Sequence, residues 1–282
     1  MLRRFDWRAF SAASVAAAKA ARGARVSVCI PAVNEQPTVG DVVSCIRADL
    51  MEQALVVDEL LVIDDGSRDA TAKEAEAAGA VVLSLPSTAG KGAAMRQGLQ
   101  ATSGDIVVYC DADIYDFSAR FVLGLVGPLI AEPGIALVKG AYRRPLDGQE
   151  GEGGRVTELV AKPLIGLLFP ELAPLRQPLA GEAASWRHVL ADLDFEAGYG
   201  VELGMLIDIV RRHGPQAVAE ADLGERRHRN RPLAELAPQA ETVVRVALRR
   251  AGLLGNGALR PGQPAAPWSS NGNDGSYSRE VR

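Results

Sequence analysis

Apolar and polar positions along residues 25–114 follow a pattern typical of strands that alternate with helices. Apolar runs rich in β-branched residues occupy residues 25–31, 59–64, 80–84 and 105–109. Helical periodicity fills the three intervals, the first helix beginning after a cap at Thr38 and the second ending at Gly79. This order predicts a parallel sheet with right-handed crossovers. We therefore expect an α/β fold whose first half is doubly wound and mostly parallel, like one nucleotide-binding unit.

The pattern loosens after residue 114, and the expected elements become irregular in length and spacing. They are a helix at 121–130, a strand at 135–140, a helical stretch at 155–168, a helix opening at 198–204, a strand at 218–223 and a last helix at 233–254. A charged, Gly-rich loop at 147–154 and a turn-rich connection at 176–182 lie between them. We interpret 115–254 as a mixed second half, and 255–282, rich in Gly, Pro, Ser and Asn, as a disordered tail.

Residues 1–24 contain early arginines followed by an Ala-rich run, as a targeting segment would. Asp6 precedes the run and Lys19 closes it early, which does not suit a signal peptide. We interpret the segment as a helix docked on the domain, with Trp7 and Phe10 as its apolar anchors.

Composition excludes several classes of protein. The net charge of −4 argues against a nucleic-acid binder. No segment approaches the roughly 20 uninterrupted apolar residues of a membrane span. The cysteines at 29, 45 and 110 form no zinc pattern, so we interpret them as reduced residues of a cytoplasmic protein.

Candidate chemistry begins where the fourth strand ends, at Asp111 and Asp113. In an open α/β sheet, ligands bind outside the carboxyl ends of the strands. Two carboxylates at that edge suit Mg²⁺ or Mn²⁺, and such an ion can bridge a diphosphate. An isolated Asp-x-Asp is more often a solvated loop. The chain has neither G-x-G-x-x-G nor a P-loop motif, so nucleotide binding would depend on these acidic strand ends.

Eight short motifs resemble those of a known enzyme family. The first-half motifs are PAVNE (31–35), DDGS (64–67), GKG (90–92) and DAD (111–113), and they resemble a GT-A glycosyltransferase. The second-half motifs are GRVTEL (154–159), QPLAGE (177–182), GYGVE (198–202) and HRNRP (228–232). Together they resemble the glucosyl-3-phosphoglycerate synthase family, and the resemblance covers about residues 1–255.

The resemblance implies a GT-A fold and a retaining transfer of glucose. The donor would be a nucleotide diphosphate sugar, usually UDP-glucose, and the acceptor the 2-hydroxyl of D-3-phosphoglycerate. It also implies dependence on Mg²⁺ or Mn²⁺, a homodimer, and a place in methylglucose lipopolysaccharide synthesis. The second half would then bind the acceptor.

The same resemblance implies roles for individual residues. Residues expected at the nucleotide sugar are Pro31, Ala32, Asn34, Glu35, Asp65, Ser84, Lys91, Asp111, Ala112, Gly181, Tyr199, Glu202 and Arg226. Residues expected at the acceptor are Gly154, Arg155, Thr157 and Asn230, and the expected metal ligands are Asp113 and His228. The expected catalytic residues are Asp113, Glu202 and Lys91, with Glu202 bonding sugar hydroxyls rather than acting as a nucleophile.

Physical chemistry supports some of these roles and leaves others open. A guanidinium such as that of Arg155 can donate two parallel hydrogen bonds to phosphate or carboxylate, although a solvated helix-start cation is an equal alternative. Lys91 could contact the nucleotide or simply face solvent. His228 lies far from Asp113 in the sequence, so only the fold could bring it to a shared ion. Covalent and front-face mechanisms both remain open.

Two positions depart from the family motif, which reads Pro-Leu-Gly-Gly-Glu followed by an aromatic residue. Ala180 adds a methyl group where backbone approaches ligand, and Ala183 replaces the ring. Mannosyl-3-phosphoglycerate synthase, or another GT-A enzyme with a small acidic acceptor, is thus the main alternative. A pyrophosphorylase and a non-catalytic sugar-nucleotide-binding protein are weaker ones. The apolar positions 243, 244, 246 and 248 could form a dimer interface or pack within the chain.

Overall fold

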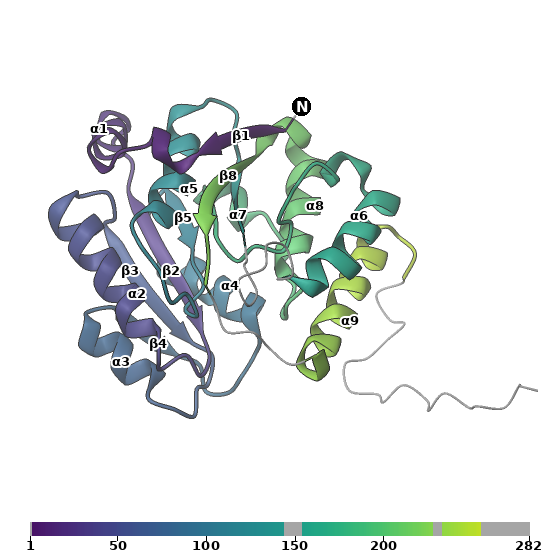
Figure 1. Cartoon of the computed structure of the whole chain (residues 1–282), viewed down its shortest axis with the longest axis horizontal. Coiled ribbons are helices and arrows are strands. Elements are labelled where there is room, and N and C mark those ends of the chain that lie inside the picture. The colour runs from purple at the N-terminus through teal and green to yellow at the C-terminus, as the bar shows by residue number, and fades with distance from the viewer. Residues whose placement is uncertain (1, 144–153, 228–232, 255–282) are drawn as a thin grey trace, which may run out of the picture.

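The computed structural model describes residues 2–143, 154–227 and 233–254, with the side chains of 233 and 234 left out. In this part of the chain a single eight-stranded sheet runs through both predicted halves (Figure 1). Its order is β1 (Arg3–Asp6), β8 (Val218–Glu225), β6 (Leu137–Arg143), β7 (Ala183–Trp186), β5 (Ile106–Tyr109), β2 (Val26–Ala32), β3 (Glu59–Asp64) and β4 (Val81–Ser84). Among these strands only β7 is antiparallel to its neighbours. The expected α/β, mostly parallel architecture is confirmed.

The first half forms as its sequence pattern predicts. The helices are α2 (Val39–Cys45), extended by a π-helical segment η2 (Ile46–Gln53), then α3 (Thr71–Ala78) and α4 (Lys91–Ala101). Gly79 ends α3 in the left-handed conformation, φ 100°, which costs glycine little. Thr38 occupies the N-cap position of α2, as predicted. Its side chain makes no capping hydrogen bond, so the predicted side-chain cap is wrong.

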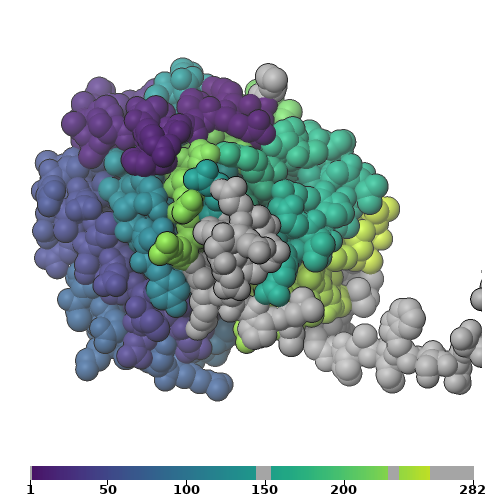
Figure 2. All heavy atoms as spheres, viewed as in Figure 1, coloured from purple at the N-terminus to yellow at the C-terminus, as the bar shows by residue number. Residues whose placement is uncertain are grey.

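The N-terminal segment begins with a strand, β1, whereas the sequence predicted only a docking helix there. β1 pairs in parallel with β8, and a short 3-10 turn, η1 (Trp7–Ala9), leads to α1 (Ala12–Arg22). The segment crosses the top of the molecule in the space-filling view (Figure 2). Trp7 and Phe10 pack against the core as expected. They fit against α5 (Arg120–Ala131) because glycine stands at 124 and 127, where a Cβ would lie 3.0 Å from Trp7 Cβ and 2.3 Å from the Phe10 ring.

The second half contains a strand, β7, that the sequence did not predict. It lies between β5 and β6 and joins the two halves of the sheet. The remaining helical elements are η3 (Thr157–Ala161), α6 (Lys162–Leu168), η4 (Pro170–Leu172), α7 (Arg187–Ala191), α8 (Val201–His213), η5 (Pro215–Ala217) and α9 (Leu233–Arg250). Figure 1 shows α6, α8 and α9 gathered on the side away from α2 and α3.

Both faces of the sheet are buried, as expected for a layered α/β fold. Residues that alternate along β5 enter different cores: Ile106 and Val108 pack with α1, α2 and α5, whereas Val107 and Tyr109 pack with α4 and α8. On α9, Val243 and Val246 are each 1% exposed and pack within the chain, which is one of the two alternatives that the sequence left open for this stripe. No described helix is long and apolar enough to cross a membrane.

The three cysteines form no disulfide bond, as expected for reduced residues. Cys29, Cys45 and Cys110 are all free, and Cys29 and Cys110 are buried. Burial raises the pKa of the Cys29 thiol to about 12, so this thiol stays protonated and inert.

Candidate active site

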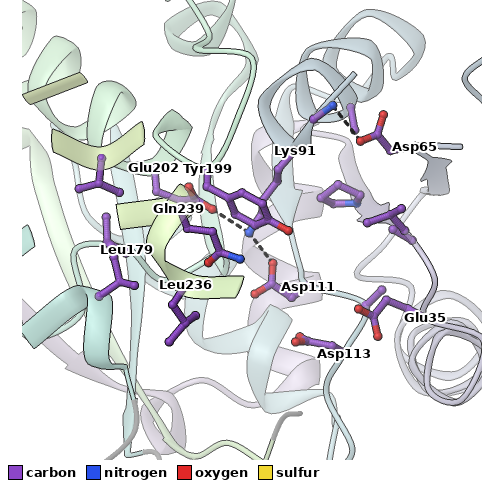
Figure 3. Close-up of a pocket in the computed structure, with 18 of the residues that line it drawn as sticks. Glu35, Asp65, Lys91, Asp111, Asp113, Leu179, Tyr199, Glu202, Leu236 and Gln239 are labelled. Carbon is purple, nitrogen blue, oxygen red and sulfur yellow. Dashed lines mark hydrogen bonds and ion pairs between the residues drawn. The ribbon is translucent and has the colours of Figure 1, made fainter. Parts of the chain in front are cut away.

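A cavity of about 270 Å³ opens at the carboxyl ends of β2, β3 and β5 (Figure 3). Both halves of the chain contribute to its wall. The predicted residues that line it are Pro31, Ala32, Glu35, Asp65, Lys91, Asp111, Ala112, Asp113, Gly154, Arg155, Thr157, Tyr199, Glu202 and Arg226. Residues expected at the donor and residues expected at the acceptor therefore share one cavity.

Asp111 and Asp113 follow β5 directly, and their side chains are 18% and 19% exposed. Arg226 Nη2 lies 2.8 Å from Asp111 Oδ2 and 2.6 Å from Asp113 Oδ1. Lys91 Nζ lies 2.7 Å from Asp111 Oδ1. Burial alone would raise the pKa of the Asp111 carboxyl, but Lys91 and Arg226 outweigh it and hold that pKa well below its usual range. Asp111 is therefore ionised throughout the physiological pH range.

Lys91 stands at the first position of α4 with both sides of its ammonium occupied. It lies 2.7 Å from Asp111 Oδ1 and 2.7 Å from Glu202 Oε1 of α8. Burial would lower the pKa of Lys91, but the two carboxylates raise it well above its ordinary value. Gly90 before it has φ 94°, and a Cβ there would lie 2.7 Å from the Ala197 carbonyl. Lys91 is thus a buried link between the halves, and a solvated surface cation is excluded.

Arg226 follows β8 and is 2% exposed. Its Nη1 donates to Tyr142 Oη at 2.7 Å and lies 3.2 Å from Glu182 Oε1. Glu182 is fully buried, and burial raises the pKa of its carboxyl. The position of Glu182 inside the QPLAGE motif was the available signal for it, yet the sequence alone assigned it no role.

Lys139 is a second buried cation, and none of the sequence motifs includes it. It points from β6 into the interior, and its Nζ donates to the carbonyl oxygen of Ala180. Burial lowers the pKa of this ammonium to about 8. A lysine inside an otherwise apolar strand was the only signal for it.

Three of the residues expected at the donor do not line the cavity. Asn34 is exposed, and its Oδ1 accepts the backbone N–H of Arg68. Ser84 is exposed at the end of β4. Gly181 lies behind Asp111, where a Cβ would come within 2.1 Å of Oδ1. Of those that do line it, Asp65 already accepts the N–H groups of residues 89 and 90, at 2.7 and 2.9 Å.

Two predicted residues, His228 and Asn230, lie outside the described residues. The structure adds lining residues to which the sequence had assigned no role: Val33, Thr88, Gly90, Ala94, Val156, Leu179, Leu236, Gln239 and Val243. Leu236, Gln239 and Val243 share one face of α9, a helix whose pattern indicated only a buried stripe. Ala180 and Ala183 do not line the cavity. They are 0% and 2% exposed and pack in the core, so the expected methyl at the ligand is not found.

A divalent ion fits the chemistry of the Asp111–Asp113 pair. Within the described ranges no group of three or more His, Cys, Asp or Glu side chains forms a complete metal cage. Mg²⁺ is usually bound through only one or two carboxylates together with substrate phosphates. The two hard carboxylates that follow the C-terminal end of β5 satisfy that requirement.

Comparisons with known proteins decide the family. Residues 27–161 match the family described as glycosyl transferase family 2. Over 259 residues the chain is 46% identical to glucosyl-3-phosphoglycerate synthase of Mycolicibacterium smegmatis, covering 88% of this chain and 84% of that relative. The chain belongs to the glucosyl-3-phosphoglycerate synthase family. It is therefore a glycosyltransferase.

Solved structures of the family and of a neighbouring specificity have the same fold. The Mycobacterium tuberculosis glucosyl-3-phosphoglycerate synthase in complex with Mn²⁺, UDP-glucose and phosphoglyceric acid has a TM-score of 0.82 at 43% identity, covering 91% of this chain and 89% of that chain. Mannosyl-3-phosphoglycerate synthase of Rubrobacter xylanophilus has a TM-score of 0.84 at 41% identity, covering 93% and 85%. The fold is thus shared by enzymes that differ in sugar.

Proposed function

We propose that the protein transfers glucose from UDP-glucose to the 2-hydroxyl of D-3-phosphoglycerate, with retention of configuration and dependence on Mg²⁺ or Mn²⁺. One observation carries the proposal. A single cavity is lined by the acidic strand ends of the first half and by Gly154, Arg155 and Thr157 of the second. A donor with a diphosphate and a small anionic acceptor would therefore meet above the same sheet edge.

Asp113, with Asp111 beside it and His228 as the further ligand, would hold the metal ion. A bound ion supplies Lewis-acid stabilisation to the diphosphate leaving group. The chain's own part is to keep Asp111 oriented, which Lys91 and Arg226 do from opposite sides at 2.7 and 2.8 Å.

The glucose would lie over Glu202 and Tyr199, which face the cavity from the start of α8. Glu202 is 3% exposed, and Lys91 fixes one of its oxygens at 2.7 Å. A carboxylate held in this way can accept hydrogen bonds from sugar hydroxyls at a defined position. Leu179, Leu236 and Val243 add apolar wall and exclude water.

The acceptor's phosphate and carboxylate would be bound by Gly154, Arg155, Thr157 and Asn230. Arg155 begins a helical stretch, where backbone N–H groups also favour anions. The described acids that line the cavity are Glu35, Asp65, Asp111, Asp113 and Glu202, and each already has a polar partner. This favours front-face transfer, in which the leaving diphosphate takes the acceptor proton and no carboxylate nucleophile is required.

The test is release of nucleoside diphosphate by the purified protein. UDP-glucose, GDP-glucose and GDP-mannose are each supplied with and without D-3-phosphoglycerate, in Mg²⁺, Mn²⁺ or chelator. Release is expected only with UDP-glucose, acceptor and metal together, and NMR should show an α-glucosidic product. Asp113→Ala and His228→Ala should lower turnover by at least about 100-fold, because a metal contributes several kcal/mol to the transition state.

Mannosyl transfer is the second candidate, favoured by the likeness to the Rubrobacter xylanophilus enzyme. Turnover of GDP-mannose in preference to UDP-glucose would establish it. Absence of turnover with every donor, from folded protein that binds UDP-glucose, would instead overturn the choice of acceptor.

We also propose that the protein is a homodimer. Leu159 and Leu167, on η3 and α6, are 73% and 80% exposed and offer an apolar face for a second copy. Light scattering should give twice the chain mass for the wild type and the mass of one chain for a Leu159→Asp, Leu167→Asp variant. A monomeric wild type would exclude the dimer.

A further inference from the structure

One nitrogen of Arg226 lies between the carboxylate of Asp111 and that of Asp113, the proposed metal ligand. Nη2 is 2.8 Å from Asp111 Oδ2 and 2.6 Å from Asp113 Oδ1. A positive group shared by two carboxylate oxygens takes the place that a bridging cation would take. We propose that Arg226 is a built-in counter-ion that holds the Asp111–Asp113 pair without metal and releases Asp113 when Mg²⁺ or Mn²⁺ binds.

The guanidinium is held from behind by residues that do not touch the metal position. Tyr142 Oη accepts from Nη1 at 2.7 Å, and the Tyr142 ring lies 5.1 Å from the guanidinium carbon. Glu182 Oε1 lies 3.2 Å from the same Nη1 and is fully buried. Arg226 thus keeps a buried counter-charge of its own. Releasing Asp113 does not leave an uncompensated guanidinium in the interior, which would be strongly unfavourable.

The two aspartates are not equivalent, and the difference identifies the one that exchanges. Asp111 has two cations, Lys91 at 2.7 Å and Arg226 at 2.8 Å. For Asp113, Arg226 is the one ion-pair partner that the described part of the chain provides. Asp113 also faces the cavity (Figure 3). An incoming ion would displace the Arg226 contact to gain Asp113, while Lys91 keeps Asp111 anchored.

Competition between Arg226 and the metal ion for Asp113 favours binding of the ion together with a nucleotide diphosphate over binding of the ion alone. Two adjacent unpaired carboxylates would attract any divalent ion, whereas the guanidinium neutralises part of that attraction. A nucleotide diphosphate brings additional oxygen ligands and so tips the competition toward the metal. The inference rests on the proposed metal site and is independent of which sugar or acceptor is used.

The decisive experiment compares Mn²⁺ binding without nucleotide in the wild type and in Arg226→Gln, by electron paramagnetic resonance titration. Because Arg226→Gln leaves Glu182 alone in the interior, the Arg226→Gln, Glu182→Gln double variant is measured beside it. The matched control is Arg176→Gln. Arg176 also bridges two acids, 2.8 Å from Glu220 and 3.0 Å from Asp222, but outside the cavity.

Both Arg226 variants are expected to bind Mn²⁺ about tenfold more tightly, since one nearby opposite charge changes the cation affinity of a carboxylate by about that factor or more. Arg176→Gln should match the wild type. Thermal shift gives a second readout, with Mn²⁺ stabilising the double variant more than the wild type. Equal or weaker Mn²⁺ binding by the folded double variant would overturn the inference. Sugar transfer is assayed separately on the wild type, so failure of the proposed activity would not be confused with this result.

Discussion

The two predicted halves differ in the regularity of their elements and in the charged residues that they contribute to the site. Residues 25–114 form regular strand–helix units, and they bring Lys91, Asp111 and Asp113 to the ion-pair network beside the cavity. The later residues form irregular elements and contribute Glu182, Glu202 and Arg226. Within each half the charges pair incompletely. Lys91 reaches Glu202 at 2.7 Å, and Arg226 reaches Asp113 at 2.6 Å, only because the halves meet.

The comparison shows that the fold depends on local strand patterns, whereas the site depends on contacts between the two halves. The strands of the first half pair with one another, β5 with β2, β2 with β3 and β3 with β4, and a local apolar run marks each of them. The ion pairs beside the cavity, Lys91 with Glu202 and Arg226 with Asp113, join the two halves at what we call the junction. This network therefore requires both halves. Changes at the junction should therefore affect stability and activity together, while changes within one half should affect one of them.

The largest effect is expected for Lys91→Met, which breaks the network at its centre. Among the described residues Asp111 would keep Arg226 alone as an ion-pair partner, and Glu202 would lose its 2.7 Å partner. Removing one partner from a buried pair costs about 3–5 kcal/mol. Urea denaturation should show that loss, and turnover should fall with it.

The control for this change is Lys162→Met, which removes a surface ion pair to Glu158 of 2.6 Å whose side chains are 38% and 42% exposed. Such pairs contribute about 0–1 kcal/mol. Equal losses in the two variants would contradict the division between junction and surface.

A smaller effect is expected for Gly181→Ala, which disturbs Asp111 without removing any charge. The new Cβ would lie 2.1 Å from Oδ1 and 2.4 Å from Oδ2, so the carboxylate must move away from its two cations. Overpacking of this kind costs about 1–3 kcal/mol. Mn²⁺ affinity and turnover should both fall, measured by titration and by release of nucleoside diphosphate.

Gly166→Ala serves as the comparison, because nothing lies within 4 Å of its added Cβ on α6. In a helix interior it should be neutral or stabilising by up to about 1 kcal/mol. A Gly181→Ala protein with unchanged metal affinity would show that the glycine is not there for Asp111.

The sequence predicted the first half well because its signals are local. β3 begins and ends where the apolar run from Glu59 to Asp64 does, and Gly79 ends α3 as expected. β7 was missed because Ala-Ala-Ser-Trp carries no strand pattern. It is a strand only because β5 and β6 supply hydrogen bonds on both sides. Strand β1 is equally short, and three of its four residues are charged.

The site divides along the same line. Asp111 and Asp113 could be chosen from the strand-end rule alone, but Arg226, more than 100 residues later, was suggested only by resemblance to a family. Glu182 and Lys139 gain their importance from burial, which no local pattern reports. Gln239 was missed because a polar residue on an amphipathic helix normally faces solvent.

Gln239 tests whether the cavity also divides between donor and acceptor. It faces the cavity from α9, the helix that packs beside η3, which carries Thr157 (Figure 3). Gln239→Glu should raise the KM for the acceptor about tenfold, or about 1.4 kcal/mol, because a carboxylate repels a trianion. The KM for the nucleotide sugar should not change. Steady-state kinetics with each substrate varied in turn measures both.

Gln97→Glu, on the exposed side of α4, is the matched control and should alter neither KM. An equal rise in both KM values for Gln239→Glu would place the donor, rather than the acceptor, beside α9.

The smallest effect is expected for Glu59→Gln, at the start of β3 and away from the cavity. Burial would raise the pKa of Glu59, but hydrogen bonds from Ser103 and Ser27, with Arg25 nearby, lower it from 4.5 to about 2. A carboxyl whose pKa is depressed in the folded state adds stability above its ordinary pKa and loses it as the pH falls toward the folded value. The variant should therefore be less stable at neutral pH by about 1 kcal/mol, reduced by solvent screening. Urea denaturation should show this gap closing as the pH falls from 4.5 toward 2, with sugar transfer at neutral pH unchanged. Glu76→Gln, exposed on α3, should show no gap at any pH, and a gap of constant size for Glu59→Gln would mean that shape rather than charge holds this end of the sheet.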